Sequence, residues 1–175
     1  MISLQVGAWI AAAVLLFWTV GAYNRLVRLR NAIVGHFAPV SERFVERHAL
    51  LQQQIEAVGT VLANAGERVE ALQAACVQAE SARAHAKAHP GAPGAIKSLR
   101  LADEIVAEAR ARLPVQTVGG VDISDLNTRL AETDTALTFA RRQFNDAVEQ
   151  YNHAVRQVPT RMIAAVFGFR PAGTL

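Results

Sequence analysis

Apolar residues recur along most of the chain at alternating steps of four and three residues. Over residues 51–79 the alternation runs without a break through Leu51, Ile55, Val58, Leu62, Ala65, Val69, Leu72, Cys76 and Ala79. It returns over residues 126–158 and, more briefly, over residues 99–113. A mean step of about 3.5 residues places these side chains on one face of a helix and is typical of helices packed side by side in a bundle or coiled coil. We call these positions the heptad seam, and they predict an all-α fold.

Proline and glycine divide the domain after residue 23 into three expected helices. Residues 89–94 contain two prolines and two glycines, and residues 114–120 form a second turn-rich stretch. Pro159 ends the last long helix, because proline cannot continue helical hydrogen bonding. We therefore expect an antiparallel helical domain or coiled coil over residues 24–158, with helices at about 24–89, 95–113 and 122–158.

Gly59 is an ambiguous position in the first of these helices. The heptad seam passes through it without a change of phase, which favours one continuous helix ending near His89. A turn at Gly59 would instead produce a short four-helix bundle.

A nearly uninterrupted apolar stretch, residues 4–23, precedes the helical domain. Its length matches the roughly 20 residues that a helix needs to cross a bilayer. Arg25, Arg28 and Arg30 follow directly, and no Lys or Arg precedes it. The positive-inside rule then predicts that residues 1–23 form a single transmembrane anchor continuing into the bundle. It places a short N-terminus outside and the bulk of the chain in the cytoplasm.

Two alternatives to a retained anchor have a similar length. A cleaved signal peptide would start with positive charge, and arginines just after the cleavage site would disfavour export. A buried helix of a soluble protein is the other alternative. We expect a retained anchor and assign these residues to the membrane interface: Trp9, Trp18, Tyr23, Arg25, Arg28, Arg30, Phe167 and Phe169.

The C-terminal segment, residues 159–175, begins with an apolar, phenylalanine-containing stretch flanked by Arg161 and Arg170. Thr160 can cap a short helix that ends near Phe167. This helix either lies in the headgroup region beside the anchor or forms a hydrophobic cap on the end of the bundle.

Asparagines recur at a spacing of seven residues in two places, and asparagine inside a packed seam requires a partner. An antiparallel register can pair Asn24 with Asn152 and Asn31 with Asn145, and buried polar pairs of this kind fix the register of coiled coils. A shift of two residues in this register brings Arg25 near Glu149 and Arg28 near Asp146. The alternative is that these asparagines are exposed and incidental.

Composition and motifs narrow the function further. The single Cys76 excludes an internal disulfide, and the net charge of +3 comes without a basic stripe interleaved with aromatics, which disfavours nucleic-acid binding. His85 and His89 lack a third metal ligand, and Cys76 lies on the heptad seam, where a thiol is inert. No phosphate-loop, zincin or nucleophile-elbow motif occurs. We therefore predict no catalytic residue, no metal site, no cofactor and no enzyme.

Three motifs in order resemble those of the LemA family. Residues 23–31, YNRLVRLRN, resemble its YNxLVxLRN opening, and residues 140–152, ARRQFNDAVEQYN, resemble its ARRxYNxAVxxYN signature. Residues 158–169, VPTRMIAAVFGF, resemble its FPxxxxAxxFGF end, whereas residues 47–55 and 90–121 depart from its pattern. The resemblance implies a bacterial inner-membrane protein with an outside N-terminus, one span and a helical cytoplasmic domain, and it implies no enzyme activity.

Two function classes follow from this organisation. One is a structural scaffold that binds membrane lipids, forms homo-oligomers through helical faces and shapes the membrane, since a narrow alanine-rich core gains burial by oligomerising. The other is a monomeric membrane-tethered adaptor that recruits an unidentified protein partner or signalling complex.

Overall fold

The computed structural model describes residues 2–59, 66–113 and 123–175, and within the first range the side chains from residue 5 onward. Five helices carry the fold and no strand occurs in these ranges, so the predicted all-α class is confirmed. Helix α1 spans Ile2–Gly59, α2 Gly66–Ala88, α3 Pro93–Ala111, α4 Ser124–Arg156 and α5 Thr160–Val166.

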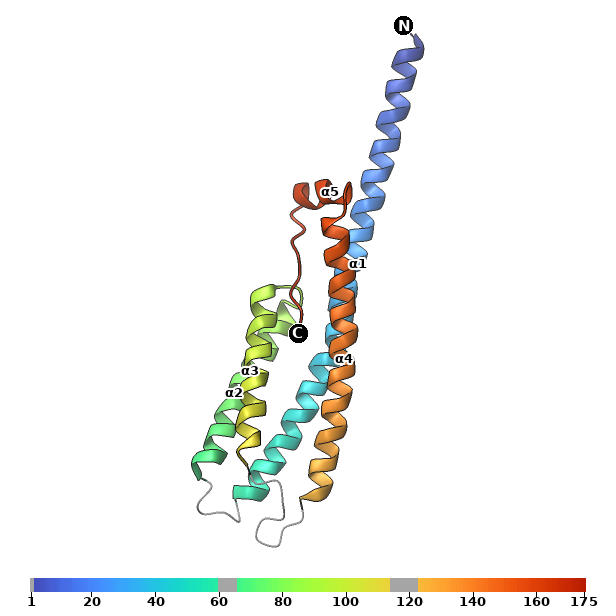
Figure 1. The fold of residues 1–175 in the computed structure, drawn as a ribbon. Coiled ribbons are helices and arrows are strands. Elements are labelled where there is room, and N and C mark those ends of the chain that lie inside the picture. Colours follow the sequence, from blue (N-terminus) through green and yellow to red (C-terminus); the bar gives the residue numbers. More distant parts are fainter. Residues whose placement is uncertain (1, 60–65, 114–122) are drawn as a thin grey trace.

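Helix α1 is a single element of 58 residues that contains both the apolar stretch and the first helix of the bundle. It is long and apolar enough to cross a membrane, and none of its most apolar window is buried against protein. This full exposure argues against the core helix of a soluble protein. Figure 1 shows the first part of α1 projecting alone beyond the other helices.

The bundle consists of two pairs of helices, α1 with α4 and α2 with α3, and the packing of α2 on α1 joins the pairs (Figure 1). Helix α4 runs back along α1, whereas α2 and α3 pack on each other and, through α2, on the distal half of α1. One hydrophobic cluster lies towards the projecting end of α1 and contains residues of all five helices, with Leu26, Phe37 and Phe144 fully buried. A second cluster, around Leu51, Leu72 and Val106, lies towards the distal end.

Helix α2 packs back against α1, which contradicts the continuous helix predicted for residues 24–89; residues 60–65 lie outside the described part of the chain. Leu72 and Cys76 of α2 pack back into the same cluster as Leu51 and Ile55 of α1. A seam in constant phase is satisfied equally by one long helix and by two antiparallel helices that face the same core, so the pattern alone could not distinguish them. The four-helix alternative is the correct one.

Two contacts fix the register of α4 against α1. The rings of Phe37 and Phe144 lie 5.5 Å apart, and the Gln54 amide donates a hydrogen bond to Asn127 at 3.3 Å. Seventeen residues separate the two α1 members, and seventeen separate the two α4 members. The predicted pairing of Asn24 with Asn152 is offset from this register by five residues.

Candidate functional site

The end of the bundle that faces the anchor is built from α1 and α5. The ring centroid of Tyr23 lies 4.9 Å from that of Phe167 and 5.7 Å from that of Phe169. Helix α5 therefore meets α1 where the apolar stretch ends. Its inward side is buried through Thr160 and Ala164, whereas its outward side chains Met162 and Val166 are 69% and 78% exposed.

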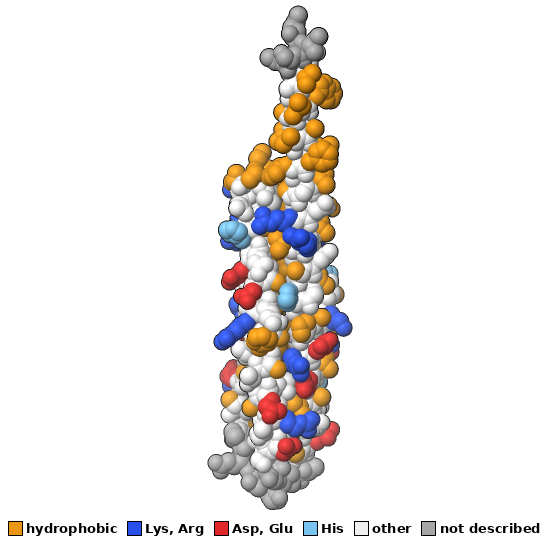
Figure 2. Space-filling model, turned by 90° about the vertical axis from the view of Figure 1, so that its right-hand side faces the viewer, with side chains coloured by type: hydrophobic (Ala, Val, Ile, Leu, Met, Phe, Trp, Pro, Cys, Tyr) orange, Lys and Arg blue, Asp and Glu red, His pale blue; other side chains and the backbone are white. Residues whose placement is uncertain are grey.

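The C-terminal segment has one side packed on the bundle and one exposed side. Gly168 adopts φ +71° and ends α5, and the backbone N–H of Phe169 then donates to the carbonyl of Ala164 at 2.9 Å, as in a Schellman turn. Phe169 packs against the core beside the anchor and caps the bundle, while Phe167 remains 52% exposed. On the face shown in Figure 2, hydrophobic side chains dominate this end and charged ones begin below it.

The other residues assigned to the membrane interface are exposed. Trp9 is 77% exposed and Trp18 38%, as lipid-facing side chains of an isolated span would be. Arg25, Arg28 and Arg30 are exposed as well and form no ion pair, among the described residues, with Glu149 or Asp146. The predicted Arg25–Glu149 and Arg28–Asp146 contacts are therefore wrong.

The predicted asparagine pairs are also wrong, because Asn145 and Asn152 bind the C-terminal tail. The Asn152 amide donates to the Ala172 carbonyl at 2.9 Å and accepts from its backbone N–H at 2.7 Å. Asn145 makes the same pair of bonds with Leu175, at 2.8 and 2.9 Å. Asn24 and Asn31 lie on the exposed side of α1, two positions before the buried Leu26 and Ile33.

The spacing of these asparagines matches an extended chain. Seven helical residues advance about 10.5 Å, and three extended residues advance about 10 Å. Two asparagines that are seven residues apart on α4 can therefore bind two tail residues that are three apart, provided that the tail is extended and runs antiparallel to α4 (Figure 1). The Tyr151 hydroxyl adds a third tether by donating to the Arg170 carbonyl at 2.9 Å, and burial raises the pKa of this phenol.

The tail fills a space between α4 and the start of α3. Gly173 approaches so closely that a Cβ there would lie 2.8 Å from the Cα of Pro93. Ala172 and Leu175 pack against the hydrophobic cluster near the anchor. The tail therefore adds contacts between α4 and the start of α3, beside the core side chains that α3 and α4 contribute to the same cluster.

Further from the anchor, charged side chains fill the equivalent space between α1, α3 and α4. Asp103 of α3 accepts hydrogen bonds from Arg47 of α1 and Arg141 of α4. Asp134 of α4 contacts Arg47 at 3.4 Å and Arg110 of α3 at 2.9 Å. We call these five residues the charge network, and Asp103 is its most buried member, with 8% of the residue exposed.

The network contains one more positive than negative side chain, and an aromatic ring offsets part of the surplus. The guanidinium carbons of Arg47 and Arg141 each lie 5.1 Å from the ring centroid of Phe44. Burial lowers the pKa of Arg47, which Asp134 opposes and the neighbouring Arg141 and Arg110 reinforce. Burial also lowers the pKa of Arg141. The two arginines remain charged, since the guanidinium group is not deprotonated in proteins.

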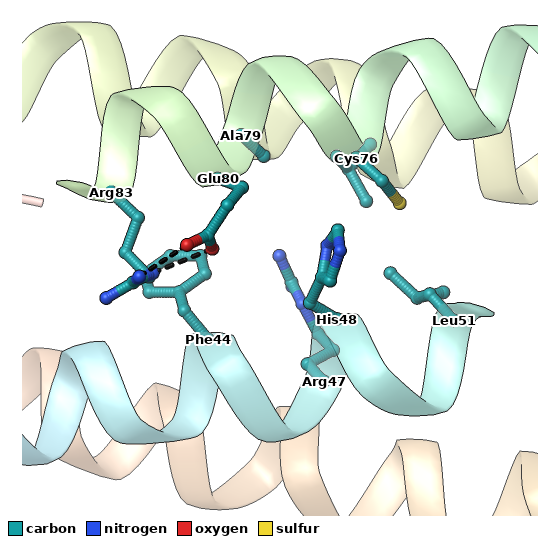
Figure 3. Close-up of a pocket in the computed structure, with 9 residues that line it drawn as sticks. Phe44, Arg47, His48, Leu51, Cys76, Ala79, Glu80 and Arg83 are labelled. Carbon is teal, nitrogen blue, oxygen red and sulfur yellow. Dashed lines mark hydrogen bonds and ion pairs between the residues drawn. The ribbon is translucent and has the colours of Figure 1, made fainter. Parts of the chain in front are cut away.

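A second face of Arg47 borders the contact between α1 and α2. Figure 3 shows Phe44, Arg47 and His48 of α1 opposite Cys76 and Glu80 of α2. The cavity between them is only about 10 Å³, which is at the lower limit for one water molecule. Burial raises the pKa of the Cys76 thiol, so this cysteine is a packing residue. This contact is therefore too closely packed to hold a ligand.

Arg83 of α2 ties the same contact together from its edge. It donates to Glu80 and, at 2.7 Å, to the Ser41 hydroxyl on α1. The hydrogen bond from Arg83 lowers the pKa of Glu80. These bonds fix the side-by-side placement of α1 and α2 without adding a reactive group.

The charge network was missed at the level of sequence, although it has a recognisable signature. Arg47 lies three residues after the buried Phe44 and four before Leu51, so it continues the heptad seam towards the N-terminus at a position where an apolar residue is the rule. Each of the other four members directly follows a small residue at a buried seam position: Ala102 before Asp103, Ala109 before Arg110, Thr133 before Asp134 and Ala140 before Arg141. Small seam residues leave room for a flanking charged side chain to turn inward.

No group of three or more potential metal ligands occurs in the described ranges. The rings of His85 and His89 lie 5.0 Å apart at the end of α2. Comparison with known families gives a match to the LemA family over residues 36–175. This match starts beyond the opening motif at residues 23–31 and includes the other two motifs. A search of the curated proteins gave no match.

Proposed function

The chain belongs to the LemA family, and on that premise we propose that it is a membrane-anchored structural protein that self-associates and organises or shapes the membrane. The LemA family is not known as an enzyme family. The proposal includes a single retained span, an N-terminus outside and the bundle in the cytoplasm, as the arginines after the apolar stretch predict.

One observation carries the proposal: anchor and bundle share the unbroken helix α1. At 1.5 Å per residue its 58 residues extend about 87 Å, with no linker between lipid and bundle. A bundle mounted on a flexible linker could tilt without disturbing the bilayer. Here lateral contacts between neighbouring bundles would impose their geometry on the anchors and thus on the membrane.

The outward face of α5 supports a fixed posture on the membrane. Val158, Met162, Val166 and Phe167 are all more than half exposed at the level where α1 leaves the bundle. Arg161 and Arg170 flank this apolar face, as in helices that lie in the headgroup region. We propose that α5 rests in the interface and acts as a second point of contact beside the anchor.

Labelling of single cysteines in the full chain, reconstituted in liposomes, tests this contact. A polarity-sensitive dye at Val166→Cys should report an apolar environment, whereas the same dye at Val77→Cys should report water. Val77 is a matched control because it is 64% exposed on α2, away from the anchor, and the buried native Cys76 leaves the dye to the new site. Equal, water-like emission from both positions would contradict an interfacial α5.

Self-association is tested by the mass of the full chain in a mild detergent. We expect light scattering to give a multiple of the 18.9 kDa chain mass. Phe139 of α4, 63% exposed, is the largest apolar side chain on the outer side of this helix, and Phe139→Glu should reduce the mass. Thr135→Glu, one turn earlier on α4, is the control. A monodisperse monomer of the unaltered chain would refute the proposal.

The adaptor function remains the second candidate because of one cavity. About 510 Å³ of open space lies between α1, the turn after α2 and the tail, with Arg30, His89 and Arg170 among its lining residues. A partner segment with acidic side chains could bind there, close to the membrane. A monomer that carries a stoichiometric partner after purification would favour this function over the scaffold.

A further inference from the structure

A cavity of about 240 Å³ opens beside the charge network, between α1, α3 and α4. Its lining residues include three arginines from three helices, Arg47, Arg110 and Arg141, and one carboxylate, Asp134. Leu51 and Val106 close its apolar side. A half-enclosed space lined by converging cationic groups is the general form of an anion-binding site.

The aspartates of the charge network accept only some of the N–H donors of its three arginines. Each guanidinium has five N–H donors. Within the described part of the chain, Asp103 and Asp134 together accept two from Arg47, one from Arg110 and one from Arg141. The Nε of Arg141 is buried and has no hydrogen-bond partner there. An unpaired buried donor on a charged group costs free energy. The three arginines that line the cavity also carry N–H donors beyond the four that the aspartates accept, and an oxyanion can accept from these.

The charge balance of the network also favours a bound anion. Three arginines against two aspartates leave one net positive charge in a partly buried network. The ring of Phe44 offsets this only in part, since a cation–π contact is weaker than a desolvated ion pair. A purely structural network could have balanced its charges with a third carboxylate.

We propose that this cavity binds a small phosphate-bearing molecule or inorganic phosphate, held between Arg47, Arg110 and Arg141. The planar donor fork of arginine matches the oxygen spacing of phosphate, and the volume suits a ligand smaller than most cofactors. Phosphate binding at this cavity does not depend on the scaffold function, so it can hold even if the chain is found not to self-associate.

The phosphate of a lipid headgroup is excluded by distance. Arg47 follows Tyr23, at the end of the apolar stretch, by 24 residues of continuous helix, which amounts to about 36 Å along α1. Headgroups at the level of α5 therefore lie far from the cavity. The ligand must come from the aqueous phase around the distal half of the bundle.

Isothermal titration of the full chain with inorganic phosphate, in a maltoside detergent that contains no phosphate, tests the site. We expect saturable binding with one phosphate per chain and no comparable signal from chloride at equal ionic strength. Arg110→Gln and, separately, Arg141→Gln should weaken binding about tenfold or more, because each removes a charged donor. Arg112→Gln is the matched control on α3, since Arg112 pairs only with the exposed Glu108 in the described ranges, and it should leave the affinity unchanged.

Several outcomes would overturn the proposal. Absence of phosphate binding at millimolar concentration would do so, and so would equal weakening by Arg112→Gln. Competition by phosphatidylglycerol added to the micelles would reassign the site to lipid. Because Arg110→Gln also breaks a contact with Asp134, its helical content and thermal midpoint must be measured alongside; if that variant is unfolded, Arg141→Gln decides the result.

Discussion

Replacing Asp103 with alanine is expected to lower the free energy of unfolding by about 3–5 kcal/mol. Asp103 accepts hydrogen bonds from both Arg47 and Arg141, and its removal leaves two guanidinium groups without this shared carboxylate in the interior. For a chain of this length the loss corresponds to a fall in the thermal midpoint of roughly 6–20 °C. Thermal unfolding of the full chain in detergent, followed by circular dichroism, measures it.

The neighbouring Glu104 provides the matched control. Its side chain is 63% exposed, and its contact with Arg100 is long, at 3.9 Å between exposed groups. Glu104→Ala should therefore change the stability by no more than about 0.5 kcal/mol. If the two alanine variants unfolded at the same temperature, the charge network would not be the tie between α3 and the α1–α4 pair that its geometry indicates.

The second large effect is expected from Gly173→Ala in the C-terminal tail. The added Cβ would lie 2.8 Å from the Cα of Pro93, and backbone cannot move aside as a flexible side chain can. Overpacking of this kind costs about 1–3 kcal/mol. We expect the tail to detach from α4 and the start of α3. Hydrogen exchange at the amides of Ala172 and Leu175, which donate to Asn152 and Asn145, should accelerate roughly tenfold or more.

Gly94→Ala is the corresponding control, since a Cβ there meets nothing within 4 Å. It introduces the same methyl group one residue after Pro93, at the start of α3. Exchange at Ala172 and Leu175 should remain at the unaltered rate. Equal protection of these amides in both variants would show that the tail tolerates the extra methyl group and is not wedged against α3.

Within the described ranges, the heptad seam correctly predicted which side of α2, α3, α4 and the distal part of α1 is buried. Leu51, Leu72, Leu99, Leu130 and Phe144 all lie in the core as their spacing requires. The same spacing could not show that the chain reverses after Gly59, because α1 and α2 contribute their seams to one cluster. Periodicity reports a helix face and carries no information on the direction in which the next helix runs.

The partners of Asn145 and Asn152 were harder to predict, because they are backbone groups and the periodicity of side chains does not reveal backbone partners. Asn145 and Asn152 do share a helix face, and a partner for them was correctly required. That partner is the backbone of Ala172 and Leu175, in a segment without regular structure. Backbone groups have no sequence signature, so pairing with the visible Asn24 and Asn31 was the natural error.

The charge network illustrates the opposite difficulty. Asp103 and Arg141 look like ordinary members of solvated helix faces when each helix is considered alone, whereas Arg47 interrupts an apolar seam. They become buried only because α3 stands away from α4 and leaves a gap that long side chains can span. Such gaps arise from the arrangement of whole helices, and a sequence shows them only indirectly, through the small residues Ala102 and Ala140 that make room.

The unbroken course of α1 also fixes an angle. Successive residues of a helix are turned by about 100° around its axis, so the exposed side chains of Trp9 and Trp18 have a fixed angular position relative to the faces of the bundle. Inserting a single residue near Tyr23 would rotate every side chain of the anchor by that amount with respect to α4 and α5. Neighbouring molecules that pack through both lipid-embedded and aqueous surfaces would then lose one contact whenever they kept the other. Under the proposed self-association, the length of the segment that joins the two regions is therefore under the same geometric constraint as the residues within it.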